Sequence, residues 1–570
     1  MINQWKARFL PHLTGSWTHS LQTTGNIYKV PILSFAEPQS VKRYLNSVKK
    51  NRWSDLDEMF AEQRLIGTNP VVIRRVTSYD DIKNSIRVEA DEHLPYMEEG
   101  CTVQTAIDGK RLYMVDYTDI LSVLPCKNGM ITAPIALFFV TEKKKLMPVA
   151  IQLFKRHLDC KDDSDNPVFK PDNANPYTWL LVKMWFNNAD ASYHQSVSHL
   201  GFTHLLMESM YLALRQTMET VSISHPLYRL MAPHFLYTLQ INKQAWDLLI
   251  SEGGSFDIVM TIGVKGLLEI VRRRYEGFRS CAPWKLDKEG NLEEDIKDRG
   301  VGLKYPDSDE YYLPNYTFRD DALDLYRIIK EYVTAVVEHY YAKETDTLEN
   351  DHEIQAWAKM LNKKCNKEKL SEGGCGIKGI PTKTVETSYG CWDEPDADDA
   401  NCQTKEERVG HFSTADQVIS VVTSIIFTGS VGHAAVNFRQ YEEYGFPLNY
   451  PSLLHGAPPR NKDIRSEEDI LQVLPTKEQT LLSMKISNLL SQHGDPDLNY
   501  LSDFEKQYQY DPVGTEAAAK FKSAIDKQIV KITRRSEDFV IRQLEGDPDA
   551  IPEIDYNILN PKFIPNSISI

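Results

Sequence analysis

The chain of 570 residues lacks several features that would each assign it to a familiar class of protein. Its eight cysteines include no CxxC pair, which argues against a thiol redox motif and against a structural zinc site. No charged and then apolar leader ending in small residues opens the sequence, so we expect a cytoplasmic protein with reduced thiols. No linker rich in Pro, Gly and Ser interrupts the apolar segments of residues 130–545, and one large domain is therefore expected.

An excess of positive charge is also missing. The chain has 65 basic and 80 acidic residues, which gives a net charge of −15. Such a chain has no long-range attraction for nucleic acid or anionic lipid except through a local basic patch. We interpret the short basic runs at 49–52 and 272–274 as solvated faces, so neither a nucleic-acid partner nor an obligate protein partner is predicted.

One apolar stretch, at 418–436, approaches the length of a membrane-spanning helix. It contains Ser, Thr and Gly together with His433, which is a poor composition for a surface that faces lipid. A helix that is apolar on all sides is also what the core of a large protein requires. We therefore predict that this segment is a helix buried inside the protein.

Two pairs of polar residues stand inside apolar helical segments. His433 and Asn437 lie four apart in GSVGHAAVNF, and because each helical residue advances about 100° they share one face. His199 and His204 lie five apart in SVSHLGFTHLL, which separates them by roughly 140° on a straight helix. These two can meet at one ion only if the helix widens into a π-type turn, a distortion that is common at functional sites.

The chain ends at Ile570, whose free carboxylate adds an anionic ligand to these side chains. Imidazole nitrogens bind iron, zinc and copper, whereas amide and carboxylate oxygens fit iron or manganese better than copper. Three nitrogens together with two oxygens therefore favour iron. For each residue taken alone, the alternative is a core histidine or a capping asparagine, and only the joint pattern argues for a metal centre.

The sequence resembles the lipoxygenases of animals and bacteria, with matching segments in the order of that family from about residue 50 to the end. Besides the two ligand segments, the resemblance is carried by ITAPIALFFV and KLMPVAIQLF (131–154), NPYTWLLVKMWFNNAD (175–190), HPLYRLMAPHFLYTLQIN (225–242), YRIIKEYVTAVVEHYY (326–341), EIQAWAKM (353–360), GAPP (456–459) and the C-terminal Ile.

This resemblance implies a non-haem iron dioxygenase with one iron per chain and a defined ligand set. Carried over by position, the ligands and catalytic residues are His199, His204, His433, Asn437 and the carboxylate of Ile570. In the family, a ferric ion with bound hydroxide removes a hydrogen atom from a polyunsaturated fatty acid, and dioxygen adds to the radical to give a hydroperoxide. No organic cofactor is required, and the terminal carboxylate is expected to stabilise the ferric state.

The resemblance also assigns three apolar residues to the substrate channel. Leu200 and Leu205 follow ligand histidines and are expected to clamp the pentadiene near the iron, with ordinary core packing as the alternative. Ala245 stands where alanine accompanies S products and glycine accompanies R products, so the sequence leans towards S stereochemistry. Gln244 stands where many relatives have Arg, so the family's carboxylate anchor at the channel mouth is not carried over.

The expected fold is mainly α, a large single helical catalytic domain over residues 1–570 with a few short β segments. Strands are expected within 111–125 and 131–153, where β-branched and aromatic residues are frequent. Helices are predicted at 175–220, 224–250, 318–343, 351–362, 413–445, 466–492 and 514–545.

The first fifty residues are too few for the β-sandwich that precedes the catalytic domain in animal lipoxygenases. We interpret residues 1–50 as an N-terminal extension with helical character. Trp5, Phe9 and Leu10 lie among basic residues there, which makes this segment a candidate for peripheral membrane contact. A covered core helix is the alternative.

Three functions from different classes are compatible with the sequence. The first is the fatty-acid dioxygenase. The second is a hydroperoxide isomerase that forms epoxy alcohols with the same ligands but with restricted access for oxygen, so oxygen uptake separates it from the first. The third is a catalytically silent lipid-binding protein, for which a missing ligand is expected, whereas the whole ligand set is present.

Overall fold

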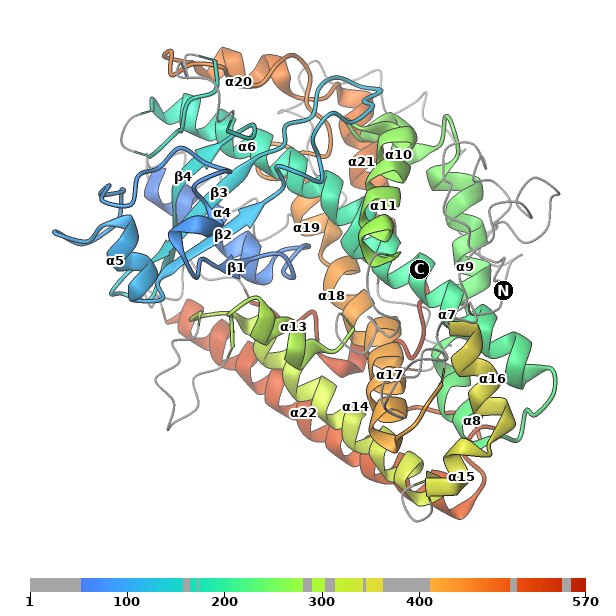
Figure 1. Cartoon of the computed structure of the whole chain (residues 1–570). Coiled ribbons are helices and arrows are strands. Elements are labelled where there is room, and N and C mark those ends of the chain that lie inside the picture. Colours follow the sequence, from blue (N-terminus) through green and yellow to red (C-terminus); the bar gives the residue numbers. More distant parts are fainter. Residues whose placement is uncertain are drawn as a thin grey trace, which may run out of the picture.

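The computed structural model describes residues 53–156, 165–171, 174–279, 290–302, 313–341, 345–361, 411–492, 500–545 and 555–570. Within these ranges the chain is mainly helical, as predicted, and the helices surround a long central rod (Figure 1). The predicted N-terminal helix with Trp5, Phe9 and Leu10 lies outside the described residues.

The strands form one antiparallel sheet at one end of the molecule, in the order β1-β2-β3-β4. Their bounds are β1 (Arg74–Arg75), β2 (Leu112–Asp116), β3 (Ile135–Val140) and β4 (Leu146–Gln152). β2 pairs with β3 in a register that places Met114 opposite Leu137, and the β3–β4 register shifts between Leu137 and Phe138. Every residue of β3 and β4 is buried, because helices α4 (Trp53–Ile66) and α6 (Pro176–Tyr193) pack against this sheet.

The central rod runs without interruption from Pro176 to Glu219, which confirms the helix predicted for 175–220. Asn175 caps its start by accepting hydrogen bonds from the backbone of Tyr177 and Thr178, and Pro176 occupies the first turn, where no amide hydrogen is needed. The rod consists of α6, the π-helical segment η3 (His194–Leu205), α7 (Leu206–Leu214) and a second π-helical segment η4 (Arg215–Glu219).

The second ligand segment is also helical and buried. Thr414 and Gln417 form a capping box at its start. It continues as α17 (Ala415–Phe427), the π-helical segment η10 (Thr428–Gly432) and α18 (His433–Asn437). The stretch 415–444 is long and apolar enough to cross a membrane, but 89% of its apolar 18-residue window is buried within the protein, in line with the prediction of a core helix.

Three predicted helices are interrupted in the structure. Residues 413–445 break at Arg439, which leaves helical geometry before α19 (Gln440–Tyr444). Pro233 lies in a 3-10 turn (Ala232–His234) that divides 224–250 into α8 (Pro226–Met231) and α9 (Thr238–Ala245), followed by the π-helical segment η6 (Trp246–Ile250). Pro475 separates α20 (Glu467–Val473) from α21 (Lys477–Leu490). A proline lacks the amide hydrogen that a continuous helix would use.

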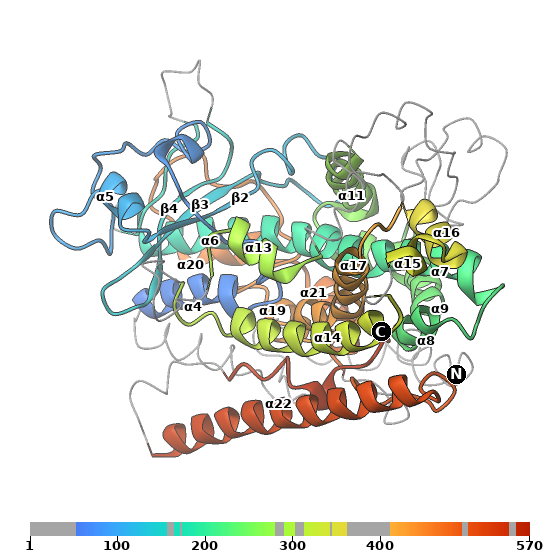
Figure 2. The ribbon, with the colours of Figure 1, turned by 60° about the horizontal axis from the view of Figure 1, so that its bottom comes forward.

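The other helices enclose the two ligand segments. α14 (Thr317–Tyr341) packs against both α17 and the 33-residue helix α22 (Pro512–Leu544), which runs along one edge of the molecule (Figure 2). The remaining helical elements are η2 (Tyr79–Asp81), α5 (Val103–Asp108), α10 (Ser255–Val259), α11 (Gly263–Arg279), α13 (Leu292–Asp298), α15 (Thr345–Glu349), α16 (His352–Leu361) and η11 (Pro561–Phe563).

The last residues of the chain are held by specific backbone contacts. Leu501 donates its amide hydrogen to the carbonyl of Ile564 at 2.7 Å, next to an isolated bridge between Tyr500 and Pro565. His234 donates from Nδ1 to the carbonyl of Asn566 at 2.8 Å. These contacts direct the C-terminal residues towards the middle of the protein, where the predicted ligands lie.

Candidate metal centre and the adjoining pocket

The π-helical segment η3 brings His199 and His204 onto one side of the rod. Their Nε2 atoms are 3.2 Å apart and their ring centroids are 4.9 Å apart. A straight α-helix would separate residues five apart by about 140°, so the wider π turn is what allows the two rings to meet. The distortion predicted from the spacing is therefore present.

His433 completes a cluster of three imidazoles from two different helices. Its ring centroid lies 5.6 Å from that of His199 and 5.0 Å from that of His204. One nitrogen of each ring lies within 4.8 Å of one nitrogen of the others, and all three side chains are buried. This is the separation that three ligands of a single ion require.

The Nδ1 atoms of His199 and His204, which we call the two rod histidines, are fixed by side-chain amide oxygens. His204 Nδ1 donates to Asn242 Oδ1 at 2.9 Å, and His199 Nδ1 donates to Gln195 Oε1 at 3.1 Å. Since an amide oxygen only accepts, both rings carry their proton on Nδ1 and present the lone pair of Nε2 to the cluster. A hydrogen bond at the outer nitrogen is the usual way in which proteins orient a metal-binding histidine.

A chain of amides connects His199 to the second ligand helix. Gln195 donates to Gln440 Oε1 at 2.6 Å, and Gln440 donates to Asn437 Oδ1 at 2.7 Å. Asn437 in turn donates to the carbonyl of Leu490 at 2.7 Å. Asn437 is fully buried, and its Oδ1 keeps a second lone pair that a metal could use.

Burial keeps the three imidazoles neutral. Desolvation lowers the pKa of His204 to about 4, against a smaller opposing effect of its bond to Asn242. Desolvation, followed by the neighbouring histidines, lowers the pKa of His199 well below its ordinary value, and the pKa of His433 is lowered for the same reasons. A neutral imidazole with a lone pair on Nε2 is the form that binds metals.

His433 Nε2 is buried and has no hydrogen-bond partner among the described residues. Leaving a buried polar atom without a partner costs on the order of 1–3 kcal/mol, which a coordinated cation would offset. Three imidazole nitrogens with an amide oxygen nearby are a donor set that suits iron better than a hard or a strictly soft cation. The residues present therefore fit a metal ion of this kind.

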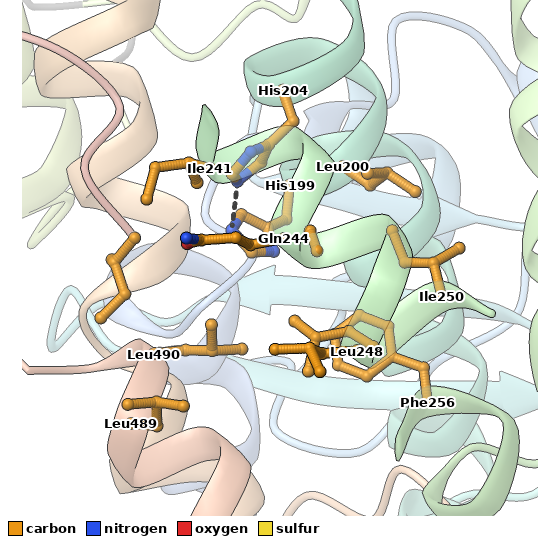
Figure 3. A pocket seen from close by; sticks show the side chains of 13 residues that line it. His199, Leu200, His204, Ile241, Gln244, Leu248, Ile250, Phe256, Leu489 and Leu490 are labelled. Carbon is orange, nitrogen blue, oxygen red and sulfur yellow. Dashed lines mark hydrogen bonds between the residues drawn. The ribbon is translucent and has the colours of Figure 1, made fainter. Parts of the chain in front are cut away.

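An apolar pocket opens beside the histidine cluster, with a volume of about 60 Å³ (Figure 3). Helix α9 and segment η6 form one wall and the end of α21 forms another. The lining residues are His199, Leu200, His204, Ile241, Gln244, Ala245, Leu248, Leu249, Ile250, Phe256, Leu489, Leu490 and Ile570.

Four residues were predicted to lie in the substrate channel or at the C-terminal carboxylate, and three of them line this pocket. Leu200, Ala245 and Ile570 are part of its lining, whereas Leu205 packs in the hydrophobic core and is not among the lining residues. Of the two leucines predicted to clamp a substrate, only Leu200 therefore lines the pocket. That the carboxylate of Ile570 binds the metal stays a prediction, which the position of this residue beside His199 and His204 favours.

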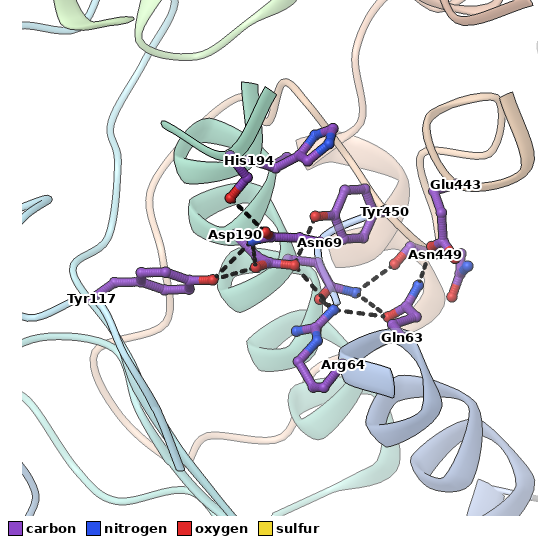
Figure 4. A network of polar contacts seen from close by, with 12 residues as sticks. Gln63, Arg64, Asn69, Tyr117, Asp190, His194, Glu443, Asn449 and Tyr450 are labelled. Carbon is purple, nitrogen blue, oxygen red and sulfur yellow. Dashed lines mark hydrogen bonds and ion pairs between the residues drawn. The ribbon is translucent and has the colours of Figure 1, made fainter. Parts of the chain in front are cut away.

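A buried polar network at the end of α6 was not predicted from the sequence (Figure 4). Asp190 Oδ1 accepts hydrogen bonds from Asn69 at 2.8 Å and from Tyr117. Its Oδ2 accepts one from Tyr450 at 2.7 Å and lies 3.1 Å from Arg64 Nη2. The sequence signal that could have revealed it is NNAD at 187–190, which places three polar residues within an apolar helix. We call the side chains of Asp190, Asn69, Tyr117, Tyr450 and Arg64 the Asp190 network.

The Asp190 network is attached to the π-helical segment. Asn69 accepts a hydrogen bond at 2.8 Å from Ser198, the residue that precedes His199. His194 begins the same segment and stacks on His199 with ring centroids 5.9 Å apart. Both nitrogens of His194 have partners, the carbonyl of Val436 and the hydroxyl of Tyr444, each at 2.7 Å, so this histidine supports the cluster and does not belong to it.

Fold and site together define a class: a mainly helical protein in which buried imidazoles from two distorted helices converge at a candidate metal site, next to an apolar pocket. Comparison with known proteins gives the family. The sequence model of the Lipoxygenase family matches residues 15–374 and 389–561. The chain belongs to the lipoxygenase family.

Its relatives include enzymes from plants and animals. The chain is 29% identical over 577 residues to the linoleate 13S-lipoxygenase 2-1, chloroplastic, of Solanum tuberosum, covering 95% of this chain and 58% of that protein. It is 26% identical over 537 residues to the hydroperoxide isomerase ALOXE3 of Rattus norvegicus, covering 93% and 64%. The chain thus spans roughly three fifths of the length of these two relatives.

Solved structures show the same arrangement of the backbone. A crystal structure of a LOX in complex with arachidonate superimposes with a TM-score of 0.73 at 25% identity, covering 94% of this chain and 71% of that one. The described helices and the small sheet therefore have the family's architecture.

Proposed function

We propose that this protein is a lipoxygenase that binds one iron ion per chain and dioxygenates polyunsaturated fatty acids of the linoleic or arachidonic type. The observation that carries the proposal is the convergence of three neutral histidines, with one orphaned Nε2, at the end of an apolar pocket. The potato relative is named for linoleate, and one similar solved structure holds arachidonate, which supports a fatty acid as substrate.

Each group near the site has a defined task in this proposal. His199, His204 and His433 would hold the iron, with Asn437 Oδ1 and the carboxylate of Ile570 as oxygen ligands. Iron bound there supplies one-electron chemistry that can remove a hydrogen atom from a weak bis-allylic C–H bond. Gln195 and Asn242 keep protons on the outer nitrogens, so that the inner nitrogens stay available as ligands.

The pocket wall would control what reaches the reacting carbon. Leu200, Leu248 and Leu490 surround the histidines with apolar surface that excludes water from a radical. The pocket is narrow in this structure, so an acyl chain must widen it on entry. Motion of α9 and η6 is the simplest route, because these two adjoining elements supply six of the thirteen lining residues.

The test is oxygen consumption together with conjugated-diene absorbance, measured on protein of known iron content given linoleic or arachidonic acid. We expect oxygen uptake matched by diene formation. Iron-loaded protein that consumes fatty-acid hydroperoxide without oxygen uptake would establish the isomerase, the activity for which the rat relative is named. Protein that binds iron and converts neither substrate would overturn the enzymatic proposal.

The role of Ile570 has its own control. Adding a few residues after Ile570 replaces its carboxylate with a peptide group, and we expect lower iron affinity and lower oxygen uptake. The same residues added before Met1 serve as the matched control, which should retain both. Equal iron affinity in the two extended proteins would remove the Ile570 carboxylate from the ligand set.

A further inference from the structure

The two rod histidines differ in how their outer hydrogen bonds end. The chain that starts at His199 passes through amide side chains and finishes on the backbone carbonyl of Leu490, so it is neutral throughout. The chain that starts at His204 passes through Asn242 and finishes on the carboxyl group of Glu208. The cluster therefore has a neutral side and an acidic side.

Asn242 is held in one orientation by three hydrogen bonds. Its Oδ1 accepts from His204 Nδ1, and its Nδ2 donates to the carbonyl of His204 at 3.0 Å and to Glu208 Oε2 at 2.7 Å. Both amide hydrogens are in use, so a flip of the amide would place its NH₂ group against an N–H donor. The proton on His204 Nδ1 is thereby fixed through a residue that Glu208 anchors.

Glu208 lies one helical turn beyond His204 on the same rod, in α7, and its side chain is buried. Burial raises the pKa of its carboxyl group, while the hydrogen bond from Asn242 opposes that change. Carboxyl groups at such depth are rare unless they are paired, and here the partner is the amide of Asn242, which also accepts the hydrogen bond from His204. A bond to a carboxylate also polarises the amide and strengthens the next bond in the chain.

Asn242 also belongs to α9, the helix that forms one wall of the pocket. It lies in α9 between Ile241 and Gln244, both of which line the pocket, and α9 packs against η3 and α7. A shift of α9 during substrate entry would therefore pull on the same amide that orients His204. Glu208 resists that shift because it holds the second hydrogen of the amide.

We propose that Glu208 is a positioning residue that acts through Asn242 to fix the orientation of His204 and to make it the more strongly donating of the two rod histidines. This inference rests on the proposed iron site and adds to it a residue that touches neither the ligands' inner nitrogens nor the pocket. An acidic group behind a histidine raises the basicity of the nitrogen that faces the metal, and loss of such partners typically costs about 10–100-fold in metal affinity or activity.

The experiment compares Glu208→Gln with Glu219→Gln. Glutamine at 208 keeps the size and an acceptor oxygen for Asn242 but removes the charge. Glu219 is the matched control because it lies on the same rod, in η4, and forms an ion pair with Arg215, away from the histidine cluster. Iron affinity is measured by competition with a chelator, and the Fe(III)/Fe(II) reduction potential by titration with mediators.

For Glu208→Gln we expect about tenfold weaker iron binding and a higher reduction potential, because the charge that favours Fe(III) is removed. We expect kcat to fall more than KM changes, and Glu219→Gln to match the wild type in every respect. The reciprocal variant Gln195→Glu, which places a carboxyl group in the neutral chain, should lower the potential.

Unchanged iron affinity and potential in Glu208→Gln, with only the stability of the fold reduced, would overturn the proposal and leave Glu208 a structural residue. Iron affinity and potential are measured without substrate. Wild-type protein that lacks oxygen uptake would therefore refute the proposed function. The comparison of Glu208→Gln with Glu219→Gln would still test the role of Glu208.

Discussion

Two buried polar clusters lie within a few residues of each other on the central rod, and they differ in how completely their atoms are paired. The carboxylate of Asp190 has four donors around it. The histidine cluster begins less than three turns later, and there His433 Nε2 has no partner among the described residues. The carboxylate at the centre of the Asp190 network is fully paired, although Arg64 Nε and Nη1 have no hydrogen-bond partner among the described residues, whereas the histidine cluster leaves a potential metal-binding nitrogen without a partner.

The difference separates two uses of buried polarity. A buried carboxylate whose oxygens are fully paired in a region of low dielectric stabilises one arrangement of the chain, and removing it is costly. Buried polar atoms that converge without hydrogen-bond partners keep their desolvation penalty, and binding of an ion can offset it. We therefore expect changes at the Asp190 network to affect stability and changes at the histidine cluster to affect iron and activity.

The largest expected effect is the loss of iron in His433→Leu. Leucine fills a similar volume without a nitrogen, so iron binding and oxygen uptake should fall to background. The unfolding free energy of the metal-free protein should stay the same or rise by about 1 kcal/mol, because a buried atom without a partner is removed. Iron analysis and urea unfolding of the metal-free protein test the two parts. A fall of several kcal/mol in the unfolding free energy of metal-free His433→Leu would mean that His433 stabilises the fold, as is expected of Asp190.

The next effect is a loss of stability in Asp190→Ala. Arg64 and the hydroxyl groups of Tyr117 and Tyr450 would then be buried without their acceptor, which should cost about 3–5 kcal/mol of unfolding free energy. Asp247→Ala is the control, because Asp247 pairs with Lys243 at the surface, where such pairs contribute about 0–1 kcal/mol. Equal urea midpoints for the two variants would show that the Asp190 network does not stabilise the fold.

A third prediction concerns pH. Burial lowers the pKa values of His194, His204 and His234 to about 4, whereas in the unfolded chain a histidine titrates near 6.5. Between these values the unfolded state binds more protons, so stability rises with pH. The metal-free protein should therefore be most stable above pH 6.5 and lose stability as the pH falls from 6.5 towards 4.

Thermal unfolding at a series of pH values tests this prediction. His194→Gln should show a shallower dependence, since one of the titrating groups is gone and glutamine can still use both partners of the ring. A melting temperature that is constant between pH 7 and 4.5 would mean that these histidines are protonated or exposed in the folded protein. The iron-loaded protein should resist acid longer, because the bound ion competes with protons at His204.

The convergence of the histidines was predictable because the sequence signals for it are local. The five-residue spacing of His199 and His204 requires a π distortion whatever the rest of the fold does, and the four-residue spacing of His433 and Asn437 needs an ordinary helix. The positions of the helices followed from apolar periodicity in the same way. Fold class and family were therefore accessible from the sequence.

Partners from distant parts of the chain were not predictable. Asn242 lies 38 residues from His204 and Arg64 lies 123 residues from Asn187, so these contacts depend on how whole helices pack. Leu205 illustrates the same limit, because its adjacency to a ligand in the sequence gave no information on which side of a π-helix it faces. The breaks near Pro233 and Pro475 were signalled in the sequence, but the apolar pattern continued across them.

The smallest change tests the pocket side of the comparison. Ala245→Gly removes one methyl group from the wall beside His199 and opens space for oxygen at a different end of a substrate radical, so we expect the product to shift from S towards R. A tenfold change in the S to R ratio needs only about 1.4 kcal/mol. Glycine in the helix costs a similar amount of stability, about 1 kcal/mol. Ala213→Gly in α7 is the control, because it makes the same backbone change away from the lining residues. Chiral chromatography of the hydroperoxide product is the measurement. An unchanged S to R ratio in Ala245→Gly would mean that other residues control oxygen access. A shift confined to this variant would show that a single methyl group directs the stereochemistry without the loss of stability expected for Asp190→Ala.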